Sequence, residues 1–249
     1  MTALAPWNQS TYNGSSSKLE RRFGSGVSFL TSFTYGKVIN LQDIGINVGS
    51  TSADTVQNAY NRQAQRGLSD MSVPCRLVMS GVWDLPFGTG RQFLDHGWVG
   101  RVVGPWQLTA IYAVQAGLPY TATLSFDNAN AGTASWPDRT CNGKLSNANI
   151  SRWFDTACFP APPAYQFGNS GKNILRGPGF NNIDLGLHRV FVLPLERRTT
   201  LDVRAEAFNS VNHPQFGNPS AVIGTSTAAV ITSTSQTNRQ MQLALRLEF

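Results

Sequence analysis

Few side chains in this 249-residue chain have the types and spacing that chemistry requires. The three histidines, His96, His188 and His213, lie far apart, without the close spacing of metal ligands. Gly168–Asn173 superficially resembles a phosphate-binding loop, but its first glycine is too close to the lysine, and an asparagine stands where Ser or Thr must hold magnesium. We interpret the histidines as ordinary polar residues and this segment as a loop.

The acidic residues do not form a catalytic pair either. Asp202 and Glu206 lie two strand steps apart on one face of an alternating segment. They are better explained as charges that face a water-filled lumen than as a general acid and base. We predict that the chain is not an enzyme and that it needs neither a cofactor nor a metal ion.

Two of the three cysteines lie in one segment rich in Asn and Gly. A disulfide between Cys141 and Cys158 would close a loop of about 17 residues, and such a loop stabilises a fold by around 3 kcal/mol. It would also imply an oxidising compartment. The alternative is two unpaired thiols. Cys75 is then the odd cysteine, and we interpret it as structural.

The composition favours strands and long loops. Charged residues make up only 14% of the chain, against about 25% in average globular proteins. A run of about 18 apolar residues is missing, which excludes a transmembrane helix but not a barrel, whose hydrophobicity is hidden in alternation. The formal net charge is +6, but Lys and Arg are scattered, which argues against a nucleic-acid partner.

The segment Arg239–Phe249 alternates polar and apolar residues, which indicates a strand with two faces. About eleven residues tilted by about 45° cross a bilayer core of roughly 30 Å. Taken alone, this strand fits a membrane barrel and a soluble sandwich equally well. Similar alternation in six more segments favours the barrel. These segments are Ser15–Phe23, Val27–Tyr35, Arg76–Leu85, Trp106–Ala116, Asn181–Phe191 and Thr200–Asn209.

The connections between the seven segments alternate in length. Outer-membrane barrels have short periplasmic turns and long extracellular loops. If Phe249 is periplasmic, every long connection lies outside and every shorter one inside. We predict an all-β fold, namely an antiparallel up-and-down transmembrane β-barrel that is partial, with about seven strands of a larger barrel. The long connections are 37–74, 117–179 and 210–238, and the shorter ones are 24–26, 86–105 and 193–199.

The positions of aromatic and charged residues agree with this orientation, because barrels carry aromatic girdles at both interfaces. Arg21 and Arg189 face outward near strand ends, where a charge costs only about 0 to 1 kcal/mol. We expect Phe23, Phe87, Trp106, Phe191 and Phe249 near the periplasmic rim, and Tyr35, Tyr112 and Tyr120 toward the outer rim. We expect Asp184, Asp202, Arg204, Glu206, Arg246 and Glu248 to face a wet lumen.

Two helical turns are possible within the long connections. Asn149 could cap a short helix over Ile150–Ala157, and irregular loop is an equal alternative. The polar segment Asp54–Gly67 could hold a second helical turn.

Seven collinear stretches carry a resemblance that covers the chain from about Tyr12 to Phe249. Together they resemble the carboxyl-terminal barrel region of TonB-dependent receptors of the Oar-like type, which carry a carboxypeptidase-regulatory-like domain. The stretches are Lys18–Phe23, Asp84–Gly88, Gln115–Tyr120, Arg152–Ala157, Asn173–Phe180, Arg204–Asn209 and Asn212–Pro219.

The resemblance implies a complete barrel of about 22 strands, with an amino-terminal plug and a TonB box through which the inner membrane drives transport. The implied partners are outer-membrane lipid, the rest of the barrel with its plug, the barrel-assembly machinery and, through the amino-terminal part, the TonB complex. Because Met1–Ser10 does not read as a signal peptide, we expect residues 1–249 to be a carboxyl-terminal fragment without a plug, in the outer membrane of a Gram-negative bacterium.

Functional residues follow from the same resemblance. Trp136, Tyr165 and Phe167 are candidates for contact with a large nutrient, although loop aromatics more often pack against other loops. Phe249, with Leu247 and Leu245, resembles the signal that the barrel-assembly machinery reads by strand addition; the alternative is simply a lipid-facing strand. The competing function is a non-transporting surface or adhesion barrel whose loops bind a partner. A third class, a secreted soluble β-sandwich, predicts a monomer without detergent.

Overall fold

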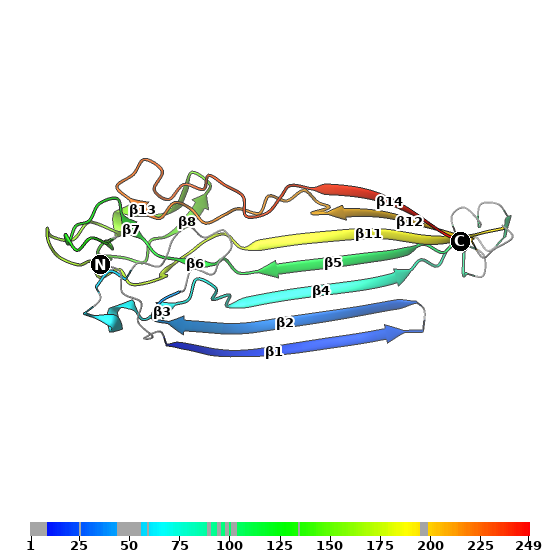
Figure 1. Cartoon of the computed structure of the whole chain (residues 1–249), viewed down its shortest axis with the longest axis horizontal. Helices are drawn as coiled ribbons and strands as arrows, with labels where there is room; N and C mark the ends of the chain where they lie inside the picture. The colour runs from blue at the N-terminus through cyan, green and yellow to red at the C-terminus, as the bar shows by residue number, and fades with distance from the viewer. Residues whose placement is uncertain are drawn as a thin grey trace.

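The computed structural model describes residues 9–249 except 25, 44–55, 59, 89–90, 94–95, 98–99, 101–103, 134 and 195–198. Its main feature is an antiparallel sheet in the order β1-β2-β4-β5-β11-β12-β14, with β3 (Gly67–Leu68) added beside β2 (Figure 1). Its long strands are β1 (Ser10–Phe23), β2 (Val27–Asn40), β4 (Cys75–Asp84), β5 (Gln107–Gln115), β11 (Phe180–Leu193), β12 (Thr199–Phe208) and β14 (Gln240–Glu248).

All seven sequence-predicted strands are confirmed, and β1, β2 and β11 are each longer than predicted. The all-β, antiparallel fold class is confirmed as well, and the sheet is not closed. β1 and β14 are the two edges of the sheet. Among the described residues, no helix is long and apolar enough to span a bilayer.

The register of the sheet keeps apolar and polar residues on opposite faces. Leu108 of β5 lies opposite Trp83 of β4 and Leu187 of β11. The preceding residue, Gln107, faces the other way and lies opposite His188. Because one face repeats every second residue, this register makes one continuous apolar face across all seven strands.

The apolar face is open to its surroundings. The exposed fraction is 38% for Leu185 in the middle of the sheet and 85% for Leu243 on the edge strand β14. A soluble protein rarely leaves so large an apolar surface uncovered. A lipid environment suits such a face, because hydrocarbon is as apolar as the side chains themselves.

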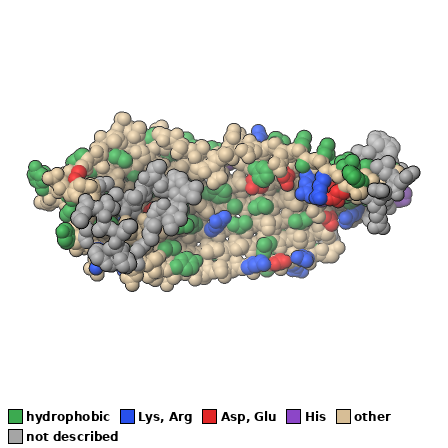
Figure 2. Space-filling model, viewed as in Figure 1, with side chains coloured by type: hydrophobic (Ala, Val, Ile, Leu, Met, Phe, Trp, Pro, Cys, Tyr) green, Lys and Arg blue, Asp and Glu red, His purple; other side chains and the backbone are tan. Residues whose placement is uncertain are grey.

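Charged residues on the opposite face pair with one another. The Asp202 carboxylate lies 2.7 Å from the His188 imidazole and 2.8 Å from the Arg204 guanidinium. The Gln242 amide donates to Glu206 on the neighbouring strand. Figure 2 shows such blue and red side chains side by side over the half of the sheet toward the short turns.

The two expected outward arginines lie on the rim aromatics. The Arg21 guanidinium is 4.5 Å from the centre of the Phe23 ring. Arg189 is 3.9 Å from the centre of the Phe191 ring and, unlike an arginine exposed at a rim, is only 7% exposed. Cation–π contact lowers the cost of placing a charge beside an apolar face.

The two ends of the sheet differ, as the alternating lengths predicted. The carboxyl terminus and the described parts of the shorter links lie at one end, and the long connections lie at the other (Figure 1). The shorter links are only partly described, because Ser25, residues 89–90, 94–95, 98–99 and 101–103, and residues 195–198 lie outside the described residues. We call the described residues of 41–74, 117–179 and 210–238 the loop module.

Candidate functional site

The loop module has its own small sheets. β6 (Pro119–Tyr120) pairs with β10 (Leu175–Arg176), and β8 (Lys144–Asn149) pairs with β9 (Arg152–Phe154). A parallel pair joins β7 (Thr123–Leu124) to β13 (Val222–Ile223). The parallel pair links the second long connection to the third, so segments distant in sequence form one body.

A hydrophobic core lies inside this module. Phe159 is completely buried, and its ring stacks edge-on against Phe154 at 5.8 Å between centres. Gly143 has a φ of +72°, and a side chain there would meet the Phe159 ring at 2.6 Å, so only glycine fits. Tyr120, expected at the outer rim of the barrel wall, instead belongs to this core. The core consists of Tyr120, Ala122, Phe154, Cys158, Phe159, Leu175 and Ala229.

A disulfide joins Cys141 to Cys158, the pairing that the sequence allowed, with 5.0 Å between the Cα atoms. Cys158 lies in the core and Cys141 on the surface, so the bond ties the start of the β8–β9 hairpin to the core. Cys75 is free and exposed.

The helix expected over Ile150–Ala157 is wrong. β9 and the short 3₁₀ helix η2 (Thr156–Cys158) occupy that segment. The Asn149 side chain accepts hydrogen bonds from the backbone N–H groups of Ser151 and Arg152, which is an Asx turn at the tip of a hairpin. A helical turn within Asp54–Gly67 is confirmed as the 3₁₀ helix η1 (Arg62–Gln65), although Asp54 and Thr55 lie outside the described residues.

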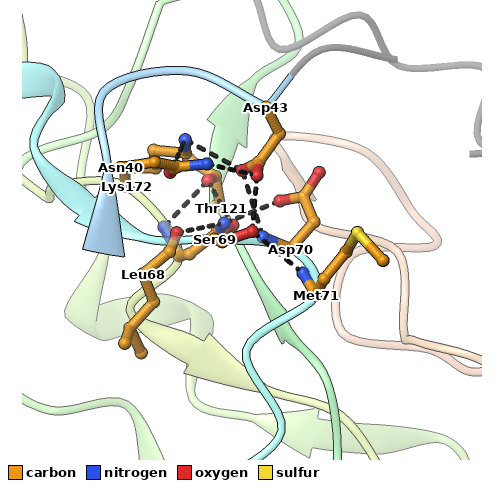
Figure 3. A network of polar contacts seen from close by, with 9 residues as sticks. Asn40, Asp43, Leu68, Ser69, Asp70, Met71, Thr121 and Lys172 are labelled. Atoms are coloured by element: carbon orange, nitrogen blue, oxygen red, sulfur yellow. Dashed lines mark hydrogen bonds and ion pairs between the residues drawn. The ribbon is translucent and has the colours of Figure 1, made fainter. Parts of the chain in front are cut away.

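A buried ion pair joins two of the long connections within the module, beside the end of β2 (Figure 3). The Lys172 side chain is 0% exposed, and its Nζ lies 2.9 Å from the Asp43 carboxylate. The same ammonium donates to the Asn40 side-chain oxygen at 2.8 Å. Asp43 also accepts from the Ser69 hydroxyl at 2.6 Å and from the Asp70 backbone N–H at 3.0 Å. The ion pair thus joins Lys172 of the connection 117–179 to Asp43 of the connection 37–74.

Asn173 extends this network beside Lys172. Its amide donates to the Leu68 carbonyl at 2.7 Å and to the Asp70 carboxylate at 2.6 Å. Its backbone N–H donates to the Thr121 hydroxyl at 2.9 Å. We call Asn40, Asp43, Ser69, Asp70, Thr121, Lys172 and Asn173 the polar latch. The segment that superficially resembled a phosphate loop therefore supplies two residues that hold the long connections together.

The pKa of Asp43 follows from these contacts. Burial acts to raise it, but the Ser69 hydroxyl, the Lys172 ammonium and the Asn40 amide outweigh burial and hold the pKa below its ordinary value. Asp43 is therefore ionised at neutral pH, and the buried lysine has its counter-charge.

The three aromatic contact candidates lie in different environments. Trp136 is only 3% exposed, and its backbone N–H donates to the Gln57 side chain at 2.7 Å. Tyr165 is 79% exposed and Phe167 41% exposed. Tyr165 and Phe167 are thus accessible from outside the module, whereas Trp136 packs inside it.

The residues expected to guide barrel assembly lie on an open edge. Leu245 on β14 is 74% exposed and Leu247 54%, and Phe249, which follows directly after β14, is 86% exposed. Leu245 and Leu247 lie opposite Val203 and Leu201 of β12 on the apolar face.

In the part of the chain that the structure describes, there is no cluster of three or more side chains that could bind a metal ion.

Comparison with protein families gave a match over nearly the whole chain. Residues 1–242 match the family model described as an outer membrane beta barrel domain. Neither the curated proteins nor the solved structures gave a match.

Proposed function

This chain belongs to the outer membrane beta barrel domain family, and from that premise we propose that it is the carboxyl-terminal barrel wall of a TonB-dependent receptor of the Oar-like type. Membership of the family places the protein in the bacterial outer membrane. The proposed role is uptake of a large nutrient, with the loop module on the cell surface. The proposal includes no catalytic step.

One observation carries this proposal: a seven-strand wall with two unpaired edges supports an elaborate module at one end. Unpaired backbone groups facing lipid cost several kcal/mol each, so more strands must complete the barrel in the membrane. The proposed partners are therefore the remaining strands with their plug, the barrel-assembly machinery at the β14 edge, and the TonB complex through that plug.

Deletion of the gene tests the proposed uptake. Growth on single oligosaccharides or peptides should fall for at least one nutrient, and deletion of the gene for TonB should reproduce that defect. The reading frame upstream of Met1 should encode a signal peptide, a TonB box and a plug. An intact gene without these segments, together with normal growth on all nutrients, would contradict the proposal.

The alternative function is a surface barrel that binds a partner without transport. The disulfide-bonded module with exposed Tyr165 and Phe167 favours this candidate. Under it, gene deletion should weaken attachment of cells to a surface or to other cells while leaving nutrient uptake unchanged.

The isolated 249-residue chain tests the open edges directly. We expect that it does not insert stably into lipid bilayers or detergent, because both edges would face hydrocarbon. Electrophoresis with and without heating measures this. A heat-modifiable, protease-resistant monomer with a cooperative unfolding transition would contradict the need for further strands.

A further inference from the structure

A cavity of about 420 Å³ opens in the loop module between the β8–β9 hairpin and the β6–β10 pair. This volume falls within the range of roughly 300 to 1,000 Å³ that small-ligand sites occupy. Tyr120, Trp153 and Phe154 contribute aromatic rings to its lining. The Trp153 indole N–H donates to the Arg176 carbonyl at 2.8 Å, which fixes the orientation of that ring.

Three cationic residues line the same cavity, and the described residues of its lining include no carboxylate. Arg139 and Arg176 each donate one hydrogen bond to a backbone carbonyl, that of Cys141 and that of Gly117. Each guanidinium keeps further N–H donors, because arginine carries five. Lys144 comes from the hairpin that the Cys141–Cys158 disulfide holds in place. Positive charge is therefore concentrated at a preformed cavity.

Tyr120 contributes its ring, not its hydroxyl, to the lining of this cavity. The residue is only 8% exposed, and its hydroxyl oxygen is closed off from solvent and has no hydrogen-bond partner among the described residues. Burial raises the pKa of this phenol, so it stays protonated. A buried polar group without a partner costs about 1 to 3 kcal/mol, which the module accepts beside the cavity.

We propose that this cavity binds a ring-bearing organic carboxylate. The carboxylate binds to Arg139, Lys144 and Arg176. The two guanidinium groups match its geometry, and the lysine adds a third positive charge. The ring of the ligand lies against the Trp153 side chain, which lines the cavity. Acidic sugars and aromatic acids share this chemistry. The presence of a binding site does not depend on the proposed function. The statement that its ligand is the transported nutrient does rest on that function.

The test measures binding to outer membranes of cells that produce the protein with all of its partners. The probes are a radiolabelled dihexuronate, the matching neutral disaccharide and 2-naphthoate. We expect saturable binding of at least one of the two acids and none of the neutral sugar. Binding of the dihexuronate would identify the ligand as an acidic sugar, and binding of 2-naphthoate would identify it as an aromatic acid.

Two substitutions at exposed positions test the charges. Arg139→Gln and Lys144→Gln should each weaken binding about tenfold. The matched control is Arg152→Gln, because Arg152 lies on the same hairpin, pairs with Asp155 at 2.7 Å and does not line the cavity. It should bind like the wild type. The amount of each variant in the membrane, measured by immunoblot, corrects for assembly.

Tyr120→Phe tests the stability of the module around the cavity. Removing the hydroxyl should make the module more resistant to unfolding, because a buried donor without a partner disappears. Unchanged affinity in both charge variants, equal binding of the neutral sugar, or no binding of either acid would overturn the proposal. Binding of the acid without its uptake would support the cavity as a binding site and contradict the proposed transport. Uptake of the acid without binding at this cavity would support transport and contradict the site.

Discussion

The apolar side chains of the barrel wall and those of the loop module lie in opposite environments. Among the described residues, every buried hydrophobic side chain belongs to the module, including Phe159 at 0% exposure. On the wall, Leu243 is 85% exposed and Leu185 38%. The apolar face of the wall is therefore left for surrounding lipid to cover, whereas the module buries its own core.

The two regions also use charge differently. On the polar face of the wall, Arg246 and Glu248 form an ion pair in which both side chains are more than half exposed, although Asp202, the partner of Arg204, is only 14% exposed. In the module, Lys172 is fully buried and meets Asp43. Exposed pairs contribute about 0 to 1 kcal/mol, but losing one partner of a buried pair costs several times more. The module should thus be sensitive to single charge changes that the wall tolerates.

The largest expected effect is in the polar latch. Lys172→Met leaves the Asp43 carboxylate without its counter-charge, and breaking a buried pair costs about 3 to 5 kcal/mol. Hydrogen exchange measured by mass spectrometry should speed up in residues 169–176 and not in the strands of the wall. Lys37→Met is the matched control, because Lys37 is exposed on β2.

Removing both charges tests whether the cost comes from the uncompensated carboxylate. The double variant Lys172→Met with Asp43→Asn should recover most of the lost protection. If Lys172→Met alone changed exchange no more than Lys37→Met, the latch would not hold the module in place.

The next largest effect concerns the disulfide. Replacing Cys141 and Cys158 together by Ser should destabilise the module by about 3 kcal/mol. Protease digestion of outer membranes should then cut within 141–158 faster than in the wild type. Cys75→Ser serves as the control, because this thiol is free and exposed on β4. Equal digestion of the double variant and the control would contradict a stabilising bond.

A charge on the apolar face tests the wall. Leu243→Arg should cost about 2 to 4 kcal/mol at the middle of the bilayer and lower the amount of protein in the outer membrane. Gln242→Arg is the matched control, because its neighbour Glu206 lies on the polar face and accepts a hydrogen bond from residue 242. Equal loss from both variants would mean that the two faces of β14 do not differ in environment.

The wall could be predicted from the sequence because its signal is local. Alternation with a period of two identified all seven strands, and the lengths of the links predicted which ends of the strands carry the long connections. The module could not be predicted in this way, because its contacts join distant residues. Lys172 and Asn40 are 132 positions apart, and no local pattern marks such a pair. The prediction of a helix after Asn149 was wrong because an asparagine side chain suits both a helix N-cap and an Asx turn. The pairing of β8 with β9 selects the turn.

The smallest effect is a dependence of the module on acid. The folded state lowers the pKa of Asp43, so its ionised form stabilises the module fully above the unfolded pKa of about 3.9. That contribution is lost as the pH falls through the lower folded pKa. Hydrogen exchange in residues 169–176 should therefore speed up only at pH values under about 4. The double variant Lys172→Met with Asp43→Asn has neither charge, so its exchange should depend less on pH. An identical pH dependence in the wild type and the double variant would assign the acid response to other carboxylates, and the latch would then not distinguish the module from the wall.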